Sequence, residues 1–133
     1  MSTTRRSLVA ALLSFVAIGC GDDGPVKYEV TGIASFQGKP IEKGEIRFLP
    51  LDGKGTVGSA PITDGEFELM SEPGTKRVEI RAAVKSKRQM KGPPGMTMPV
   101  MMDEMLPPKY HRESTLQKDV TPDGDNHFEF ELN

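Results

Sequence analysis

Arg77-Val-Glu-Ile-Arg-Ala-Ala-Val84 is the stretch that decides the fold of this chain. Apolar side chains occupy every second position from Val78 onward, and the charged side chains of Arg77, Glu79 and Arg81 stand between them. Successive side chains of a β-strand point to opposite faces of a sheet, so a period of two predicts a strand with one buried face and one solvated face. The stretch therefore predicts a strand that packs on a core through one face only.

The same alternation recurs in short segments separated by turn residues, at intervals of about 8–12 positions. One of these turns, Asp64-Gly65, predicts a hairpin, because glycine accepts a positive φ angle. It is clear in the closing segment, where Phe128, Phe130 and Leu132 face one way and Glu129 and Glu131 the other. The pattern predicts an all-β fold, a single sandwich or barrel over residues 27–132. The expected strands cover residues 28–36, 44–49, 58–62, 66–69, 77–84, 116–120 and 127–132. The expected core contains Val30, Phe48, Phe67, Val78, Ile80, Phe128 and Phe130.

The first 19 residues have the layout of a secretory signal peptide. Arg5 and Arg6 supply positive charge, and the 11 residues from Leu8 to Ile18 carry none. A transmembrane helix needs roughly 20 apolar residues, so this run predicts an export signal that is removed, by the general secretion route, and not a membrane span.

Ala17-Ile18-Gly19-Cys20 ends the apolar run and resembles the lipobox of bacterial lipoproteins, with Ala17 where that family prefers Leu. The resemblance implies that the Cys20 thiol carries a diacylglyceryl group, that the chain is cut before Cys20 and that the new amine is acylated, for example with palmitate. Two or three acyl chains hold a protein firmly to a membrane, at about 0.8 kcal/mol per buried methylene. The alternative is an ordinary signal peptide followed by a chance cysteine. Cys20 is the only cysteine of the chain, so no intramolecular disulfide can form.

Residues 20–26 are then a short lipidated tether ahead of the sandwich. From Cys20 onward the chain has 15 basic and 19 acidic side chains, a formal charge of −4, which does not favour nucleic acid as a partner. Sorting rules for the residues after the cysteine vary among bacteria. The sequence therefore predicts a lipid anchor in a membrane of the cell envelope without choosing the inner or the outer membrane.

Several turn and strand motifs follow one another in a specific order. They are Val30–Ile41, Gly44–Pro50, Thr63–Phe67, Pro73-Gly74, Leu106–Tyr110, Ser114–Leu116 and Phe128–Leu132. Their order resembles that of carboxypeptidase-regulatory-like, transthyretin-like domains, above all in small bacterial lipoproteins of the planctomycete type. The resemblance implies a Greek-key, immunoglobulin-like β-sandwich of seven or eight strands with a non-catalytic role. Some related domains bind carbohydrate or protein. No residue role carries over from that family except lipid attachment at Cys20.

Side chains that perform chemistry in other proteins are few and isolated in this sequence. His111 and His127 have no second ligand at zinc spacing and are expected on the surface. The run from Asp123 to Asn126 does not match the order of a calcium loop, and a hairpin turn explains it. No catalytic serine elbow, zinc-protease pair or phosphate-binding glycine loop occurs. We therefore expect no enzyme activity, no cofactor and no metal site.

The unusual segment is the loop expected over residues 85–106, whose part from Met90 to Met105 holds six of the eight methionines. Its prolines and glycines predict that it contributes no regular strand and that it is dispensable for folding. The basic run from Lys85 to Lys91 is expected to be a solvated part of this loop. The methionines could cover one end of the sandwich or be disordered, contact a partner, or bind Cu(I), for which thioethers are suitable soft ligands.

Taken together, these features predict a membrane-tethered binding or structural module of the cell envelope. Its expected partners are the membrane, through the lipid, and an envelope protein or carbohydrate. The alternative is a periplasmic copper-binding lipoprotein that uses the methionine-rich loop.

Overall fold

The computed structural model describes residues 24–88 and 90–133, so the expected signal peptide and Cys20 lie outside the described residues. The described chain is all-β, as the alternation predicted, with one short 3-10 helix, η1 (Pro108–Tyr110). The strands are β1 (Tyr28–Phe36), β2 (Lys39–Pro40), β3 (Lys43–Pro50), β4 (Gly58–Thr63), β5 (Glu66–Ser71), β6 (Gly74–Lys85), β7 (Met102–Glu104), β8 (Gln117–Val120) and β9 (His127–Leu132). The described residues thus form nine strands, and β2 and β7 are short strands that the sequence did not predict.

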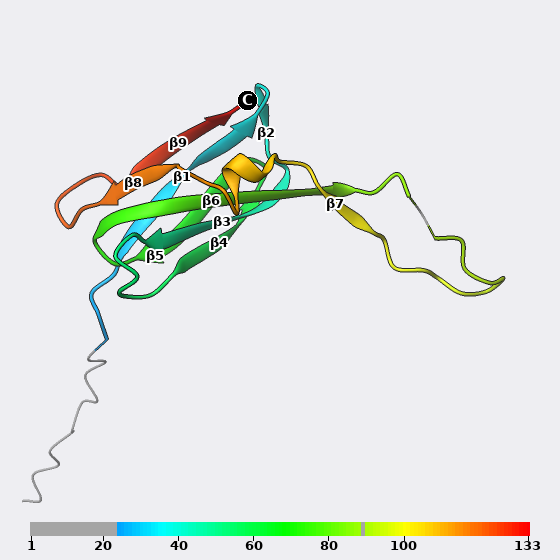
Figure 1. Ribbon diagram of the computed structural model, residues 1–133, viewed down its shortest axis with the longest axis horizontal. Helices are drawn as coiled ribbons and strands as arrows, with labels where there is room; N and C mark the ends of the chain where they lie inside the picture. The colour runs from blue at the N-terminus through cyan, green and yellow to red at the C-terminus, as the bar shows by residue number, and fades with distance from the viewer. Residues whose placement is uncertain (1–23, 89) are drawn as a thin grey trace, which may run out of the picture.

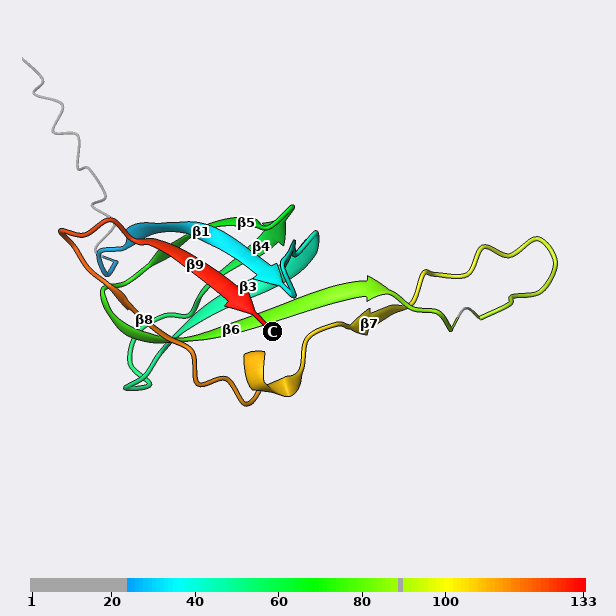
Figure 2. The same cartoon turned by 90° about the horizontal axis from the view of Figure 1, so that it is seen from above.

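The strands form a curled sheet with two facing layers (Figures 1 and 2). One layer contains β9, β1 and β5, and the other contains β4, β3, β6 and β8. The hairpin from β4 to β5 joins the layers, with Thr63 and Glu66 as its registered pair. β1 and β9 run parallel, and the other registered strand pairs are antiparallel.

Two tight turns have the backbone that their residues predict. Asp64 and Gly65 have φ angles of 51° and 83°, and Gln37 and Gly38 have φ angles of 51° and 76°. Two successive positive φ angles make a type I′ turn, whose twist matches that of the strands it joins. The positive φ angles of Asp64 and Gly65 therefore confirm the hairpin expected at this position.

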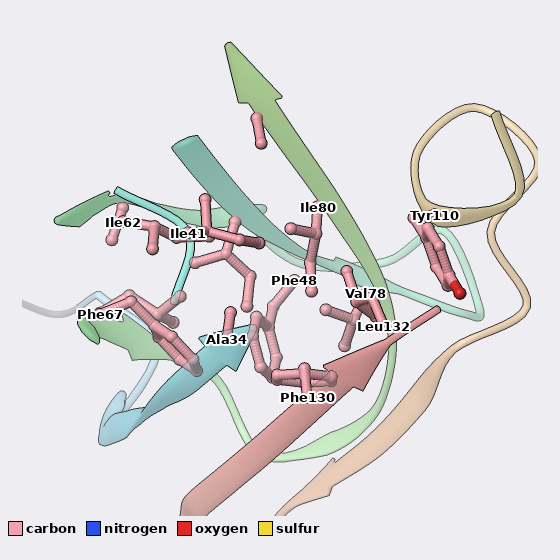
Figure 3. Close-up of a cluster of buried hydrophobic side chains, with 14 of the residues drawn as sticks. Ala34, Ile41, Phe48, Ile62, Phe67, Val78, Ile80, Tyr110, Phe130 and Leu132 are labelled. Carbon is pink, nitrogen blue, oxygen red and sulfur yellow. The ribbon is translucent and has the colours of Figure 1, made fainter. Parts of the chain in front are cut away.

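The core lies between the two layers and is built from the inward positions of both (Figure 3). The ring of Phe48 lies 6.4 Å from that of Phe67 and 6.1 Å from that of Phe128, measured between centroids. Phe67 in turn lies 6.0 Å from Phe130, so aromatic contacts cross from one layer to the other. Six of the seven expected core residues are buried, and Phe128 is half-buried. Further buried residues are Ala34, Ile41, Ile46, Ile62, Leu69, Leu106, Tyr110, Val120 and Leu132.

A lysine side chain lies over the half-buried ring of Phe128. The ammonium of Lys118 on β8 lies 5.6 Å from the centroid of the Phe128 ring and 5.5 Å from that of Phe130. A cation over an aromatic face is attracted to the ring, and its methylene stem can cover apolar surface. Lys118 therefore covers the side of the core between β8 and β9.

The outward positions of the deciding stretch are also paired. Glu79 is almost fully buried, and its two carboxylate oxygens lie 3.5 Å from Arg47 Nη1 and 2.8 Å from Arg77 Nη2. A carboxylate that loses its hydration needs such partners, and removing one of them is expected to be costly. The ion pairs therefore support the pairing of β3 with β6 on the face away from the core.

Removal of the Ile80 side chain tests the core. We expect Ile80→Ala to lower the free energy of unfolding by about 2–5 kcal/mol, because the residue is fully buried and the change leaves a cavity. Leu51→Ala is the matched control, since Leu51 is 50% exposed and should change stability by less than about 0.5 kcal/mol. Urea denaturation followed by circular dichroism measures both, and equal effects of the two substitutions would contradict the assigned core.

Candidate functional site

The two ends of the sandwich differ in what they carry. The described chain enters at Gly24 and begins β1 at one end, and a long hairpin projects from the other end (Figures 1 and 2). The nine residues of β1 place these ends roughly 26 Å apart, at about 3.3 Å per residue. No helix within the described residues is long and apolar enough to cross a membrane.

The projecting hairpin is an extension of β6. The pairing of β6 with β3 ends at Ala82, and the next residues of β6 pair with β7 instead, from Ala83 with Glu104 to Lys85 with Met102. Beyond that pair, the amide of Ser86 donates to the carbonyl of Met101 at 2.8 Å. We call residues 85–88 and 90–102 the arm, because they extend away from both layers (Figure 2).

The base of the arm is fixed by a carboxylate. Glu104 Oε1 accepts hydrogen bonds from the amide of Ala82 at 2.9 Å and from the amide of Leu106 at 3.1 Å. Met105 donates its own amide to the carbonyl of Ala82 at 2.7 Å, and Leu106 is buried in the core. The expectation that residues 85–106 contribute no regular strand is therefore wrong for β7. The sequence pattern missed it because the partner of β7 is the extension of β6, outside the regular sandwich.

The methionines of the arm are mostly in solvent. Met90 and Met96 are 64% and 69% exposed, and Met101 and Met102 are also exposed. Met98 is half-buried and its sulfur lies against Gly92, where a Cβ atom would come within 2.8 Å of it. Met105, below the arm, packs on the core. The arm therefore presents thioethers outward, and it does not cover the end of the sandwich.

A groove of about 910 Å³ lies between the arm and the β1–β2 hairpin. Its apolar lining includes Phe36, Val84, Val100, Met102 and Met105. Charged side chains of Lys39, Glu42, Lys43 and Lys85 also line it. An apolar groove with a few charged groups is typical of a binding surface.

The two histidines differ. His127 is exposed and its Nδ1 lies 3.0 Å from Thr31 Oγ1, as expected of a surface residue. His111 is buried, so the expectation that it lies on the surface is wrong. Its Nε2 lies 3.2 Å from the carbonyl oxygen of Leu106, which can only accept, so Nε2 carries the proton. Its Nδ1 is buried without a hydrogen-bond partner among the described residues.

His111 follows η1, which also buries Tyr110. The Tyr110 hydroxyl donates to the carbonyl of Asn133 at 2.7 Å and accepts from the amide of Asn133 at 2.8 Å. These bonds hold the C-terminus against the segment that follows the arm. The sequence motif Leu106–Tyr110 is therefore a structural link between the arm and the sandwich.

The acidic run near the C-terminus is a connection between β8 and β9, and the expectation of a hairpin turn is wrong, because β8 pairs with β6 and β9 pairs with β1 in the other layer. The Asn126 side chain accepts from the amide of Thr121 and donates to its carbonyl, both at 2.9 Å. Asp119 lies outside this connection and accepts from the hydroxyl of Thr75 at 2.5 Å. No cluster of three or more His, Cys, Asp or Glu side chains suited to a metal ion occurs among the described residues.

A second hollow, of about 450 Å³, lies at the opposite end of the sandwich, beside the loop after β3. Glu72 borders it and accepts from the hydroxyl of Thr56 at 2.7 Å and from the amide of Thr56 at 3.0 Å. These hydrogen bonds hold the pKa of Glu72 below its usual value, and the positive charge of Lys76 acts in the same direction. These two hydrogen bonds attach the loop after β3 to the residue that follows β5.

Comparison with known proteins identifies no relative. The chain matches no protein-family model, no curated protein sequence and no solved structure. The arm and the groove are therefore the features from which a function can be argued.

Two deletions compare what the tip of the arm and its base contribute to stability. We expect replacement of residues 87–100 by an Asn-Gly turn to leave stability nearly unchanged, because the Ser86–Met101 hydrogen bond remains and each halving of a loop changes its closure entropy by only about 0.6 kcal/mol. Removal of all of residues 85–106 should cost at least about 3 kcal/mol, since it takes away the carboxylate of Glu104 and the buried Leu106 side chain. Thermal denaturation distinguishes the two deletions. Equal destabilisation would show that the tip is part of the fold.

Proposed function

We propose that this protein is a non-catalytic binding module of the cell envelope, held to a membrane by lipid on Cys20, and that the arm is its contacting element. The observation that carries the proposal is the placement of the arm at the end of the sandwich opposite Gly24 (Figure 1). A tether attached before Gly24 would leave the arm and its groove free to meet a partner.

The composition of the arm supports a binding role. It carries exposed methionine and valine side chains together with cations and no acidic residue. Methionine is flexible and polarizable, and Met-rich surfaces adapt to partners of different shape. Apolar surface left in solvent at a projecting element has no role in the stability of the fold, since the base of the arm alone is tied to the core.

The remaining expectations fit this proposal. The order of turn motifs and the all-β sandwich support placing the chain among carboxypeptidase-regulatory-like lipoproteins, whose role is expected to be non-catalytic. The lipobox-like sequence before Cys20 supports lipid anchoring and export to the cell envelope. The partner class proposed here is an envelope protein, because the groove and the arm are apolar with a charged rim.

Crosslinking in intact cells tests the proposal. A photo-crosslinking amino acid at position 96, at the tip of the arm, should form protein adducts, and the same amino acid at exposed position 51, at the tether end, should form few or none. Cys20→Ala should move the protein out of the membrane fraction and reduce the adducts at position 96, because it removes the lipid. Absence of adducts at position 96, or full membrane retention of the Cys20→Ala protein, would contradict the proposal.

Copper binding is the second candidate, and the outward thioethers of Met90, Met96 and Met101 are the observation that favours it. Under the binding-module proposal, we expect the intact protein to compete with a Cu(I) chelator no better than the protein that lacks residues 87–100. Spectrophotometric titration with the chelator measures this difference. Clearly tighter binding by the intact protein would assign the arm to copper.

A further inference from the structure

The outer face of the layer β9–β1–β5 is a second surface with unusual chemistry. Its outward positions carry five glutamates, two exposed apolar side chains and no lysine or arginine. We call this surface the acidic face. It consists of Glu29, Thr31, Ile33 and Ser35 of β1, Glu66, Glu68 and Met70 of β5, and His127, Glu129 and Glu131 of β9.

The strand register sets the arrangement of charges around an apolar centre. Ile33, 44% exposed, pairs with Glu66 on one side and with Glu129 on the other. Glu68 lies beside Thr31, and Met70, 51% exposed, lies beside Glu29. Neighbouring strands are about 4.8 Å apart, so the two carboxylates that flank Ile33 are roughly 10 Å apart and leave its side chain accessible between them.

No carboxylate of the acidic face forms an ion pair with a lysine or arginine of the described chain. This differs from Glu79 on the other layer, which two arginines satisfy. Five unpaired negative charges around exposed Ile33 and Met70 do not stabilise the fold. They form a surface complementary to a ligand that is both cationic and apolar.

The arm of this same chain has that chemistry. It carries Lys85, Lys87, Arg88 and Lys91 and no acidic side chain, together with its exposed methionines. The rest of the described chain has 11 basic and 17 acidic side chains, a formal charge of −6. The molecule is therefore strongly polarised, with a positive projecting element and a negative body.

The arm cannot readily reach the acidic face of its own copy. It leaves from β6, in the opposite layer, and points away from the sandwich, whereas the acidic face is the outer side of β1, β5 and β9 (Figure 2). The acidic face of a second copy is not restricted in this way, because two separate copies can approach each other in any orientation.

We propose that the acidic face is the docking site for the arm of a second copy of this protein. Cations from Lys85 to Lys91 lie against the glutamates, and arm methionines contact Ile33 and Met70. The contact joins two different surfaces, so it is heterologous and leaves one arm and one face free in each pair, which extends into a ring or an open chain. The inference rests on the proposed role of the arm as the binding element and names its partner.

The test uses the full chain in membranes isolated from the cells that produce it, with a photo-crosslinking amino acid at position 33. We expect a covalent product of twice the chain mass, with peptide mapping that joins position 33 to residues 85–102. The same amino acid at position 51, which is 50% exposed in the loop after β3, should give no such product. Salt of about 1 M should suppress the product, since the Debye length then falls to about 3 Å.

Charge reversal makes the test specific. Lys87→Glu/Arg88→Glu/Lys91→Glu on the arm, or Glu66→Lys/Glu68→Lys/Glu129→Lys on the face, should each reduce the product roughly tenfold or more. A chain with both sets reversed should regain it, which also shows that the variants fold. Lys54→Glu/Arg81→Glu/Arg112→Glu changes the net charge equally at exposed positions outside the arm and the groove and should have little effect.

The outcomes are separable from those of the proposed function. Absence of the double-mass product, or a product that neither reversal reduces, overturns the inference. Adducts from position 33 to a different, cationic protein also overturn it and assign the face to that partner. If position 96 then still forms adducts with other envelope proteins, the arm remains a binding element and only the identity of its partner changes.

Discussion

The packing of Phe48 between the two layers is the contact on which the rest of the structure depends. Its ring meets Phe67 and Phe128 from the facing layer, and both layers must therefore keep their period of two in register. A slip by one residue in β5 or β9 would place glutamates in the core. Gly32 belongs to the same constraint, because a Cβ atom there would collide with the carbonyl oxygen of Phe128 and with the Phe67 ring.

Once the inward positions are committed to the core, the outward positions of the two layers are used differently. On β3 and β6, Glu79 forms ion pairs with two arginines, and only 7% of its side chain is exposed. On β1, β5 and β9 the charges have one sign, and Ile33 separates Glu66 from Glu129, so no two glutamates are directly opposite. Like charges placed directly opposite would destabilise the sheet, and the observed spacing reduces that cost. The ion pairs of Glu79 therefore stabilise the sheet, whereas the glutamates of the acidic face form no such pair within the described chain.

Sequence patterns predicted what is local, and distant contacts account for what they missed. Alternation placed the strands, and Asp64-Gly65 placed a hairpin, because both signals depend on neighbouring residues. The parallel pairing of β9 with β1 joins His127 to Thr31 across most of the chain, and no local signal specifies it. Met102–Glu104 has no strand pattern of its own, and it becomes β7 because β6 continues beyond its partner β3. Burial of His111 likewise depends on the carbonyl of Leu106 and on η1, which packs beside β6. The sequence identified the arm by its methionines, prolines and glycines. The direction in which the arm projects, and the gathering of five glutamates on one face, depend on how the strands pair and could not be predicted from the sequence.

A lipid tether before Gly24 would change the strength of contact that assembly requires. Charged surfaces in solution attract each other over only about 8 Å at physiological ionic strength, so four cations and five carboxylates form a weak contact between free molecules. Confinement of every copy to one membrane would raise the effective concentration of arms near acidic faces. A contact too weak to join soluble molecules can then be populated at the membrane. The anchor and the arm would act together, because the first restricts the copies to a plane and the second selects which surfaces meet within it.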